Sequence, residues 1–517
     1  MLFKKKKINP RRRRVRDSIA AGRFDRIAEI AASPYLAALA VWLLFAIACW
    51  LLLAVQTQGK DILTFWNVEM RPAKEMIALA LLVSMTALAA GLYVYAYQPR
   101  IAARASRTMA LAGVFLLLLT LARTVSMYPQ WIYLTTGTAV ACAAVMSIAY
   151  DQRFALGMSI LYSTLACFAV GATAGLELFM TMAAGAAVCC FCLREIRTRM
   201  KIIEVSILAT AAVFLTVLAL GLLHEQPATV FQNAASASVV TIAVGIFIQA
   251  FLPFIERIFG IATSMTLMDY SDANQPLLKK LAMEAPGTFS HSLLVGTLSE
   301  TAAETIGANG LLCRVGAYYH DIGKLNKPGY FVENQFGAAS RHEQLSPAMS
   351  QLVIVGHVKD GVEVAREFGL PSVLKQFIET HHGTTLIEYF YNEAKKKQDQ
   401  RLSSVSDSDF RYPGPKPRSK EAAIVMLADA AESATRCLTE FTPTRIEALV
   451  HSLAMKRLQD GQLDQCDLTL REMSRIETAI AKSLAAYRHG RIAYPKQNET
   501  AADEEKSQSA DATEVNS

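Results

Sequence analysis

Three stretches decide how this chain is interpreted: GAYYHDIGK at residues 316–324, GHVKDGVEVA at 356–365 and ETHHGT at 379–384. Six of the nine histidines lie between His291 and His382, although histidine is scarce in the rest of the chain. Buried polar groups without partners are costly, so metal coordination or dense hydrogen bonding is the natural explanation for such a cluster.

Local signals place these residues on helices. Thr288 is expected to cap a helix that has His291 at its third position and ends near Gly307. The apolar run LLCRVGAYY predicts a buried helix that ends at His320 and Asp321. Three further helices are expected to carry site residues: one begins at Ser346-Pro347 and carries His357, one begins at Leu370-Pro371 and ends at His381-His382, and one follows Ser419 and carries Asp429.

Adjacent residues on a helix point about 100° apart, so His320 and Asp321 serve two metal ions more easily than one. We interpret Asp321 as the bridge of a binuclear site, because a carboxylate can bridge and an imidazole cannot. The expected ligands are His291, His320 and Asp429 on one ion, and His357 and His381 on the other. His382 either reaches a metal, contacts phosphate or orients His381.

The expected donors are nitrogen and oxygen atoms, which suit Mn, Fe, Zn or Ni, and no thiolate narrows the choice. Two such ions would hold a water between them, lower its pKa and clamp phosphodiester oxygens for in-line attack. A single buried histidine is more often a structural core residue than a ligand. A purely structural origin for the whole set of histidines and aspartates is a weak alternative.

The half of the chain before residue 258 has a membrane composition. The whole chain is 52% hydrophobic with a mean hydropathy of +0.26, and most of that excess precedes residue 258. Eight apolar segments are expected to cross the bilayer: 34–56, 76–97, 108–122, 131–149, 154–173, 178–193, 205–223 and 237–255. The basic runs KKKK (4–7) and RRRR (11–14) favour contact with anionic lipid over binding to a nucleic acid polymer.

Positive charge in the loops is biased toward the side of the N-terminus, which predicts that the N-terminus and the histidine-rich region are both cytoplasmic. The predicted organisation is a basic N-terminus (1–33), a first transmembrane helix (34–56), a short extracytoplasmic loop (57–74), a seven-helix transmembrane domain (75–258), a coupling segment (259–283), a helical hydrolase domain (284–494) and a disordered acidic tail (495–517).

The soluble part resembles the HD-domain phosphohydrolases, and among them the membrane-bound seven-transmembrane HD proteins of the PgpH type. The motifs that carry the resemblance are EAPGTFSHSL (284–293), GAYYHDIGK (316–324), LSPAMS (345–350), HVKDGVE (357–363), HHGTTLIEYFY (381–391), RYPGPKP (411–417) and MLADAAE (426–432). The fold class that follows is all-α, with a polytopic helical membrane domain before an all-helical HD domain.

The resemblance implies an enzyme of the bacterial inner or plasma membrane that cleaves cyclic di-AMP to pApA with two divalent ions, Mn or Fe. Catalytic roles are expected for Asp321, Lys324 and His382. Lys324, four residues after His320, would face the same side of a continuing helix and could neutralise phosphate, although a solvated lysine explains it equally well. Lys324 and His342 are candidate substrate contacts, and the loop residues Arg411, Tyr412 and Lys416 are expected to cover a bound dinucleotide, although a plain surface loop explains them equally well. Longer relatives carry a large extracytoplasmic domain where this chain has only the loop 57–74.

Other functions remain open from sequence. Cyclic di-GMP is disfavoured, because its hydrolases carry GYP after the paired histidines, whereas this chain reads HHGTTLIEYFY. A deoxynucleoside triphosphate hydrolase and a nucleotide-binding receptor without hydrolysis are alternatives. A transporter is a third, but the membrane half lacks a broken-helix signature. A homodimer or a signalling partner is also left open.

Overall fold

The structure is a computed structural model that describes residues 34–57, 68–171, 175–193, 196, 198–223, 226–335, 340–398, 406–438 and 440–489. The chain divides into two compact units, residues 1–269 with 371–373, and residues 270–370 with 374–517. The predicted basic N-terminus (1–33) and acidic tail (495–517) lie outside the described residues, as does most of the predicted loop 57–74.

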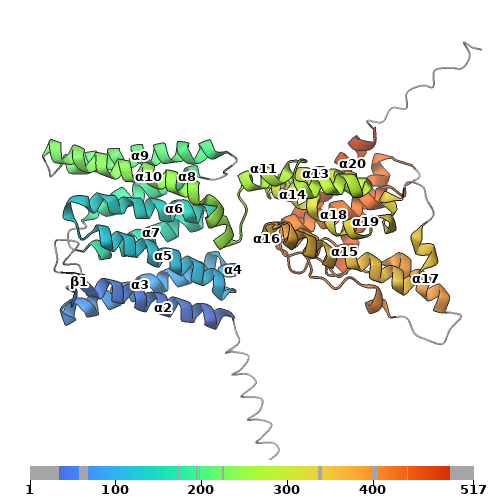
Figure 1. Ribbon diagram of the computed structural model, residues 1–517, viewed down its shortest axis with the longest axis horizontal. Helices are drawn as coiled ribbons and strands as arrows, with labels where there is room; N and C mark the ends of the chain where they lie inside the picture. Colours follow the sequence, from blue (N-terminus) through green and yellow to red (C-terminus); the bar gives the residue numbers. More distant parts are fainter. Residues whose placement is uncertain are drawn as a thin grey trace, which may run out of the picture. The chain divides into compact units, whose positions relative to one another are not determined.

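The first unit is a bundle of apolar helices that lie side by side (Figure 1). They are α2 (Pro34–Ala54), α3 (Ala73–Tyr97), α5 (Ala105–Val125), α6 (Thr136–Ala149), α7 (Gln152–Val170), α8 (Leu176–Cys192), α9 (Arg199–Gly221) and α10 (Pro227–Phe259), with the short α4 (Pro99–Ala102) before α5 and the 3₁₀ turn η2 (Pro129–Thr135) before α6. Each predicted membrane segment falls on one of these helices. The chain is a multi-pass membrane protein.

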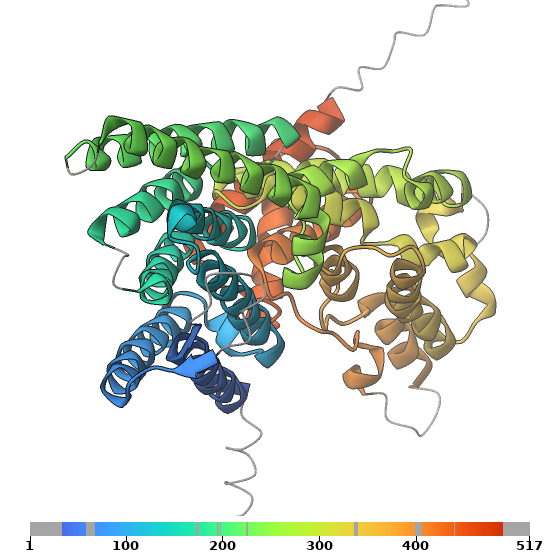
Figure 2. The same ribbon diagram turned by 60° about the vertical axis from the view of Figure 1, so that its left-hand side comes forward.

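Seven of the described helices are long and apolar enough to cross a membrane, whereas α8 has only 17 residues. The predicted number of eight crossings therefore stays a prediction. In the bundle, α2 and α3 lie at one edge, α9 and α10 at the other, and α6 and α7 between them (Figure 1), and Figure 2 shows the same order.

Small residues let the membrane helices approach closely, as expected where lipid tails supply little hydrophobic drive between helices. At Gly185 of α8, an added Cβ would lie 2.8 Å from a Val213 methyl of α9 and 2.9 Å from a Val140 methyl of α6. A larger side chain at Gly185 would therefore force α8 away from both neighbours.

The predicted polar loop after the first helix begins and ends as a β-hairpin stem. Strand β1 (Val55–Thr57) pairs antiparallel with β2 (Val68–Met70), with Val55 opposite Met70. The Arg123 guanidinium at the end of α5 donates to the carbonyls of Val55 (2.9 Å) and Ala169 (2.8 Å). Arg123 thus ties the stem to the ends of two helices.

The segment after the last membrane helix is fixed to it by a buried carboxylate. Helix α10 ends at Gly260, which adopts the left-handed conformation (φ 63°) that glycine tolerates best. The Glu256 carboxylate then accepts bonds from the Thr263 amide (2.7 Å) and the Thr266 hydroxyl (2.8 Å), at the start of α11 (Ser264–Ser271). These hydrogen bonds therefore fix the turn between α10 and α11, which is the first part of the predicted coupling segment.

The second unit is built from α-helices and 3₁₀ turns. They are α12 (Pro276–Glu284), α13 (Pro286–Thr305), α14 (Gly310–Tyr319), η3 (Ile322–Asn326), η4 (Pro328–Tyr330), η5 (Val332–Asn334), η6 (Arg341–Gln344), α15 (Pro347–Glu367), α16 (Ser372–Thr380), α17 (Glu388–Gln398), η7 (Asp407–Phe410), α18 (Lys420–Thr435), α19 (Pro443–Gln459) and α20 (Leu470–His489). Apart from the β1–β2 stem, the described elements are helical, which confirms the predicted fold class.

Helix α18 is the centre of this unit. Every residue from Ala422 to Asp429 is buried, and a helix that is buried on all sides is surrounded by other elements. It packs against α13, α14, α19 and α20. This burial holds Asp429 at a fixed place in the core.

Helix starts were predicted well where a local cap exists. Ser346 accepts a bond from the Met349 amide, and Ser419 accepts one from the Ala422 amide, as expected of N-caps. The predicted Thr288 cap of α13 was wrong, because α13 already begins at Pro286. Its first amides, at Gly287 and Thr288, are bound by the Asn334 side chain at 2.9 and 3.1 Å.

Candidate metal centre

The histidines and aspartates of the sequence motifs converge inside the second unit. His291 lies on α13, His320 directly follows α14, and His357 lies on α15. His381 and His382 follow α16, and Asp429 lies on α18. All are buried except His382, which is partly exposed. The structure therefore brings together the ligand residues expected from sequence.

Hydrogen bonds fix which imidazole nitrogen carries the proton. Nδ1 lies 2.6 Å from the Ala317 carbonyl in His320, 2.5 Å from the Ile354 carbonyl in His357, and 3.0 Å from the Phe377 carbonyl in His381. A carbonyl only accepts, so each Nδ1 must donate. In a neutral ring each Nε2 is then an unprotonated lone pair, and the Nε2 atoms of His357 and His381 lie 3.1 Å apart. A metal ion bound by both nitrogens would satisfy this pair.

Asp321 divides the cluster into two halves. Its Oδ2 lies 3.2 Å from His320 Nε2 and 3.8 Å from His291 Nε2. Its Oδ1 lies 3.4 Å from His357 Nε2 and 3.5 Å from His381 Nε2. Each oxygen thus faces a different pair of imidazoles, which is the arrangement that a bridging carboxylate makes.

The donor set fits divalent metal ions. His320 Nε2 and Asp321 Oδ1 are fully buried and have no hydrogen-bond partner among the described residues. Three groups have ligand atoms within 4.8 Å of one another: His291, His320 and Asp429; His320, Asp321 and His381; and His357, His381 and His382. Unpaired buried donors that converge in this way are typical of metal sites.

The electrostatics keep the carboxylates ionised. Burial alone would raise the pKa of Asp321, but the His320 imidazole and the Lys324 ammonium hold that pKa well below its usual range. Burial lowers the pKa of His357 to about 3, so this imidazole is neutral at physiological pH and its Nε2 is free to bind metal. Burial alone would lower the pKa of His291, but hydrogen bonds to the Asp429 and Glu432 carboxylates raise it to about 9.

Lys324 does not lie where sequence reasoning placed it. The helix stops at Tyr319 and the chain continues as the 3₁₀ turn η3, so Lys324 does not sit one α-helical turn after His320. Its ammonium instead lies 2.7 Å from Asp321 Oδ2 and 2.7 Å from Glu333 Oε1. Lys324 orients the proposed bridging carboxylate in this structure.

Glu432 was missed by the sequence analysis. Its carboxylate accepts a bond from His291 Nδ1 at 2.6 Å and is paired with Arg436 on the next turn. This contact turns His291 Nε2 toward Asp429, 3.0 Å away. The signal was present in the spacing Asp429-x-x-Glu432, which puts both carboxylates on one helix face.

We expect Glu432→Gln to weaken metal binding by about 10–100-fold, because a partner that orients a metal-binding histidine typically contributes that much. Divalent metal titration of the purified protein measures the change. Glu421→Gln, on the same helix, is the matched control, since the Glu421 carboxylate accepts a hydrogen bond from the Asn309 amide rather than from a histidine. Equal metal affinity in the two variants would contradict the role of Glu432.

A cavity of about 880 Å³ opens beside the histidines, with His357 and His382 in its wall. Its other lining residues include an aromatic and basic group, Lys324, Tyr330, Phe331, His342, Tyr389, Phe390, Lys397 and Tyr412, together with the acidic Glu333, Glu343 and Glu393. Aromatic faces stack on nucleobases, and lysines attract phosphate. The size and lining suit a ligand that combines both chemical groups.

The predicted substrate contacts divide into two kinds. His342 and Tyr412 line the cavity, and the Tyr412 ring stacks on His382 with centroids 4.2 Å apart. Arg411 and Lys416 do not line it. Arg411 is paired with Asp460 at 3.0 Å, and the Lys416 ammonium donates to the Gly461 carbonyl at 2.8 Å. Both side chains anchor their loop to the end of α19, so the expected lid role has no support in this geometry.

A helical membrane bundle joined to a domain with clustered histidines and aspartates defines a class of membrane-bound HD proteins, and comparisons with known proteins agree. Residues 73–263 match the family model described as 7TM receptor with intracellular HD hydrolase, and residues 288–434 match the HD domain. The two matched regions make this chain similar to seven-transmembrane HD hydrolases, in the same order of membrane helices followed by an HD domain.

Two curated relatives are named cyclic-di-AMP phosphodiesterase PgpH. The protein from Bacillus subtilis (strain 168) is 46% identical over 254 residues, which cover 49% of this chain and 35% of the relative. The protein from Listeria monocytogenes serotype 1/2a (strain 10403S) is 43% identical over 244 residues, which cover 47% of this chain and 33% of the relative. The matched region thus spans about a third of these relatives' length.

A solved structure is also similar, the crystal structure of the L. monocytogenes PgpH HD domain in complex with cyclic-di-AMP. It is 42% identical, and the match covers 42% of this chain and 99% of that chain with a TM-score of 0.40.

Proposed function

We propose that this chain is a membrane-anchored, metal-dependent phosphodiesterase that hydrolyses cyclic di-AMP to pApA. The observation that carries the proposal is Asp321, whose two oxygens face two different pairs of imidazole nitrogens beside an 880 Å³ cavity. The named activity of the PgpH relatives supports the choice of nucleotide.

The proposed ligands are His291, His320 and Asp429 for one ion and His357 and His381 for the other, with Asp321 shared. His382 joins the second group, within 4.8 Å of His357 and His381. Two bound divalent ions would supply an activated water and neutralise charge on the phosphodiester. Mn or Fe is the proposed metal, because the donors are imidazole nitrogens and carboxylate oxygens.

The protein's own residues prepare the site for this chemistry. Carbonyl bonds to Nδ1 orient His320, His357 and His381, and Lys324 holds Asp321 in its ionised form. Tyr412 supports His382 from the cavity side. Tyr330, Phe331, Tyr389 and Phe390 line the cavity, and their aromatic rings would stack on the two adenines in this proposal.

The proposal is tested by incubating the purified protein with cyclic di-AMP, cyclic di-GMP and dGTP, with Mn²⁺ or Fe²⁺ supplied, and separating the products. We expect pApA from cyclic di-AMP and little product from the other two. Binding of cyclic di-AMP without any cleavage would support a receptor instead. Cleavage of dGTP in preference would reassign the substrate.

We further propose that the N-terminus and the HD domain are cytoplasmic, where a nucleotide messenger is found. The basic runs before the first helix support this orientation. The proposal leaves room for a homodimer or a signalling partner. It also keeps the domain limits that were predicted from the sequence.

The topology gives a direct prediction. A reporter inserted after Leu223, between α9 and α10, should report the side opposite to a reporter fused after Tyr494. Ser236 lies inside α10, so an insertion there would interrupt that helix. Alkaline phosphatase and green fluorescent protein fusions distinguish the two sides. The same side for both positions would rule out the eight-span arrangement.

A further inference from the structure

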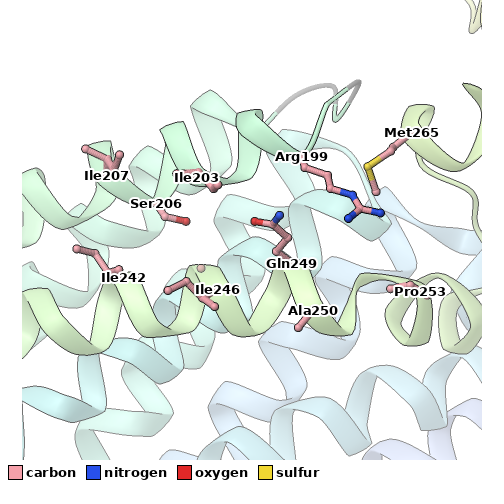
Figure 3. A pocket seen from close by; sticks show the side chains of 11 residues that line it. Arg199, Ile203, Ser206, Ile207, Ile242, Ile246, Gln249, Ala250, Pro253 and Met265 are labelled. Carbon is pink, nitrogen blue, oxygen red and sulfur yellow. The ribbon is translucent and has the colours of Figure 1, made fainter.

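A second cavity, of about 780 Å³, lies in the membrane bundle between α9 and α10 (Figure 3). Its wall is formed by Ile203 and Ile207 of α9 and by Ile242 and Ile246 of α10. These isoleucines are 36–63% exposed, so they face the surroundings of the bundle rather than its core. In a multi-pass membrane protein, such a wall faces lipid tails.

One end of this groove is polar. Arg199, the first residue of α9, and Gln249 of α10 both line it, and both side chains lie between the two helices in Figure 3. Neither side chain has a hydrogen bond or ion pair with another described residue. Pro253 also lines this end and has no N–H to donate to the Gln249 carbonyl one turn earlier. Among the described residues, the groove therefore offers a cation without an ion-pair partner, beside an amide and a backbone carbonyl that lacks its usual donor four residues later.

The polar end lies at the depth of lipid headgroups. Helix α9 has 23 residues and rises about 35 Å, close to the ~30 Å thickness of the hydrocarbon core. Its first residue, Arg199, is thus at one boundary of that core. Helix α10 has 33 residues and a length of about 50 Å, so its last turns extend past the same boundary. Gln249 and Pro253 stand where α10 leaves the hydrocarbon.

We propose that this groove binds an anionic glycerophospholipid with a hydroxyl-bearing headgroup, of which phosphatidylglycerol is the example to test. Arg199 pairs with the phosphate, and the Gln249 carbonyl accepts a bond from a headgroup hydroxyl. One acyl chain lies along the four isoleucines. A soluble anion would leave that apolar wall uncovered, so the chemistry of the groove selects a lipid over free phosphate.

The bound lipid would contact helix α11, which follows the turn at the end of α10. Met265 of α11 lines the same groove. Glu256 holds α11 against the end of α10 through Thr263 and Thr266. The site is thus made from three consecutive helices, α9, α10 and α11, and does not use the proposed catalytic residues.

The test is native mass spectrometry of the full chain in detergent with equimolar phosphatidylglycerol and phosphatidylcholine of the same acyl chains. We expect phosphatidylglycerol to be retained at least about fivefold more, the contribution of one cation near a membrane surface. Arg199→Gln should remove this preference. Arg104→Gln, at another exposed arginine of the bundle, is the matched control and should keep it.

A second pair of variants tests the groove itself. Ile246→Trp fills the space beside the wall and should lower the retention of both lipids, whereas Leu215→Trp, on the exposed face of α9 outside the cavity, should not. Circular dichroism checks that each variant is folded. Equal retention of the two lipids by the unmodified protein, or the same result for Arg199→Gln and Arg104→Gln, overturns the proposal. Displacement of phosphatidylglycerol by millimolar inorganic phosphate would show a site for free anions instead.

Discussion

Asp321→Ala is expected to reduce hydrolysis of cyclic di-AMP by more than about 100-fold, because even a partner that only orients a metal ligand contributes about 10–100-fold. Asp321 does more than orient. Each of its oxygens faces a different pair of imidazoles, so its loss removes the carboxylate between the two proposed ions. Two dications would then repel each other with less negative charge between them, and at least one should dissociate.

Metal content and single-turnover cleavage should be measured on the same preparation of this variant. Circular dichroism must show that the helices persist. Asp464→Ala is the matched control, because Asp464 is an exposed residue whose ion pair with Lys416 contributes little. A folded Asp321→Ala protein with two metals per chain and near-normal turnover would refute the bridging role.

Gly323→Ala should also inactivate the protein, although Gly323 has no side chain that could bind a metal or the substrate. A Cβ at this position would lie 1.9 Å from the His357 carbonyl oxygen and 2.4 Å from the Gly361 amide nitrogen. Both are backbone atoms of α15 and cannot turn aside, so η3 and α15 must separate. Overpacking of this kind costs about 1–3 kcal/mol of stability, and a 1 Å shift of catalytic groups can cost about 10²-fold in rate.

Gly356→Ala provides the control for this prediction. Gly356 lies on α15, next to His357, and an added Cβ there meets nothing within 4 Å. Alanine is also a better helix former than glycine by about 1 kcal/mol. Melting temperature and turnover should fall in Gly323→Ala and be maintained in Gly356→Ala. Similar losses in both variants would show that close packing at Gly323 is not the cause.

The sequence predicted most of the fold because its signals are local. Ser346-Pro347 and Ser419 are helix caps that act on amides three residues away, and both helices start where expected. The apolar membrane segments can also be recognised locally, because a helix that spans a bilayer needs a long run of apolar residues. The clustered histidines were identified for a similar reason, since their scarcity elsewhere makes the motifs distinct.

What could not be predicted depends on residues far apart in the chain. Asn334 caps α13 from 46 residues beyond Thr288, and a capping threonine in the sequence made the wrong prediction attractive. Lys324 was assigned to phosphate on the assumption of a continuing α-helix, but the change to a 3₁₀ turn directs it to Asp321. Arg411 was expected to contact the dinucleotide because it is a basic loop residue. Its ion pair with Asp460, 49 residues later, cannot be seen in the sequence.

The placement of the proposed ligands on separate helices has a thermodynamic consequence. His291, His357 and Asp429 belong to α13, α15 and α18, and the unfolded chain cannot hold them together. A metal that binds only the folded domain adds its binding free energy to the stability of that domain, about 2.7 kcal/mol when free metal is at 100 times Kd. The proposed cofactor would thus act as a folding ligand, and chelation would make the HD domain easier for proteases to degrade.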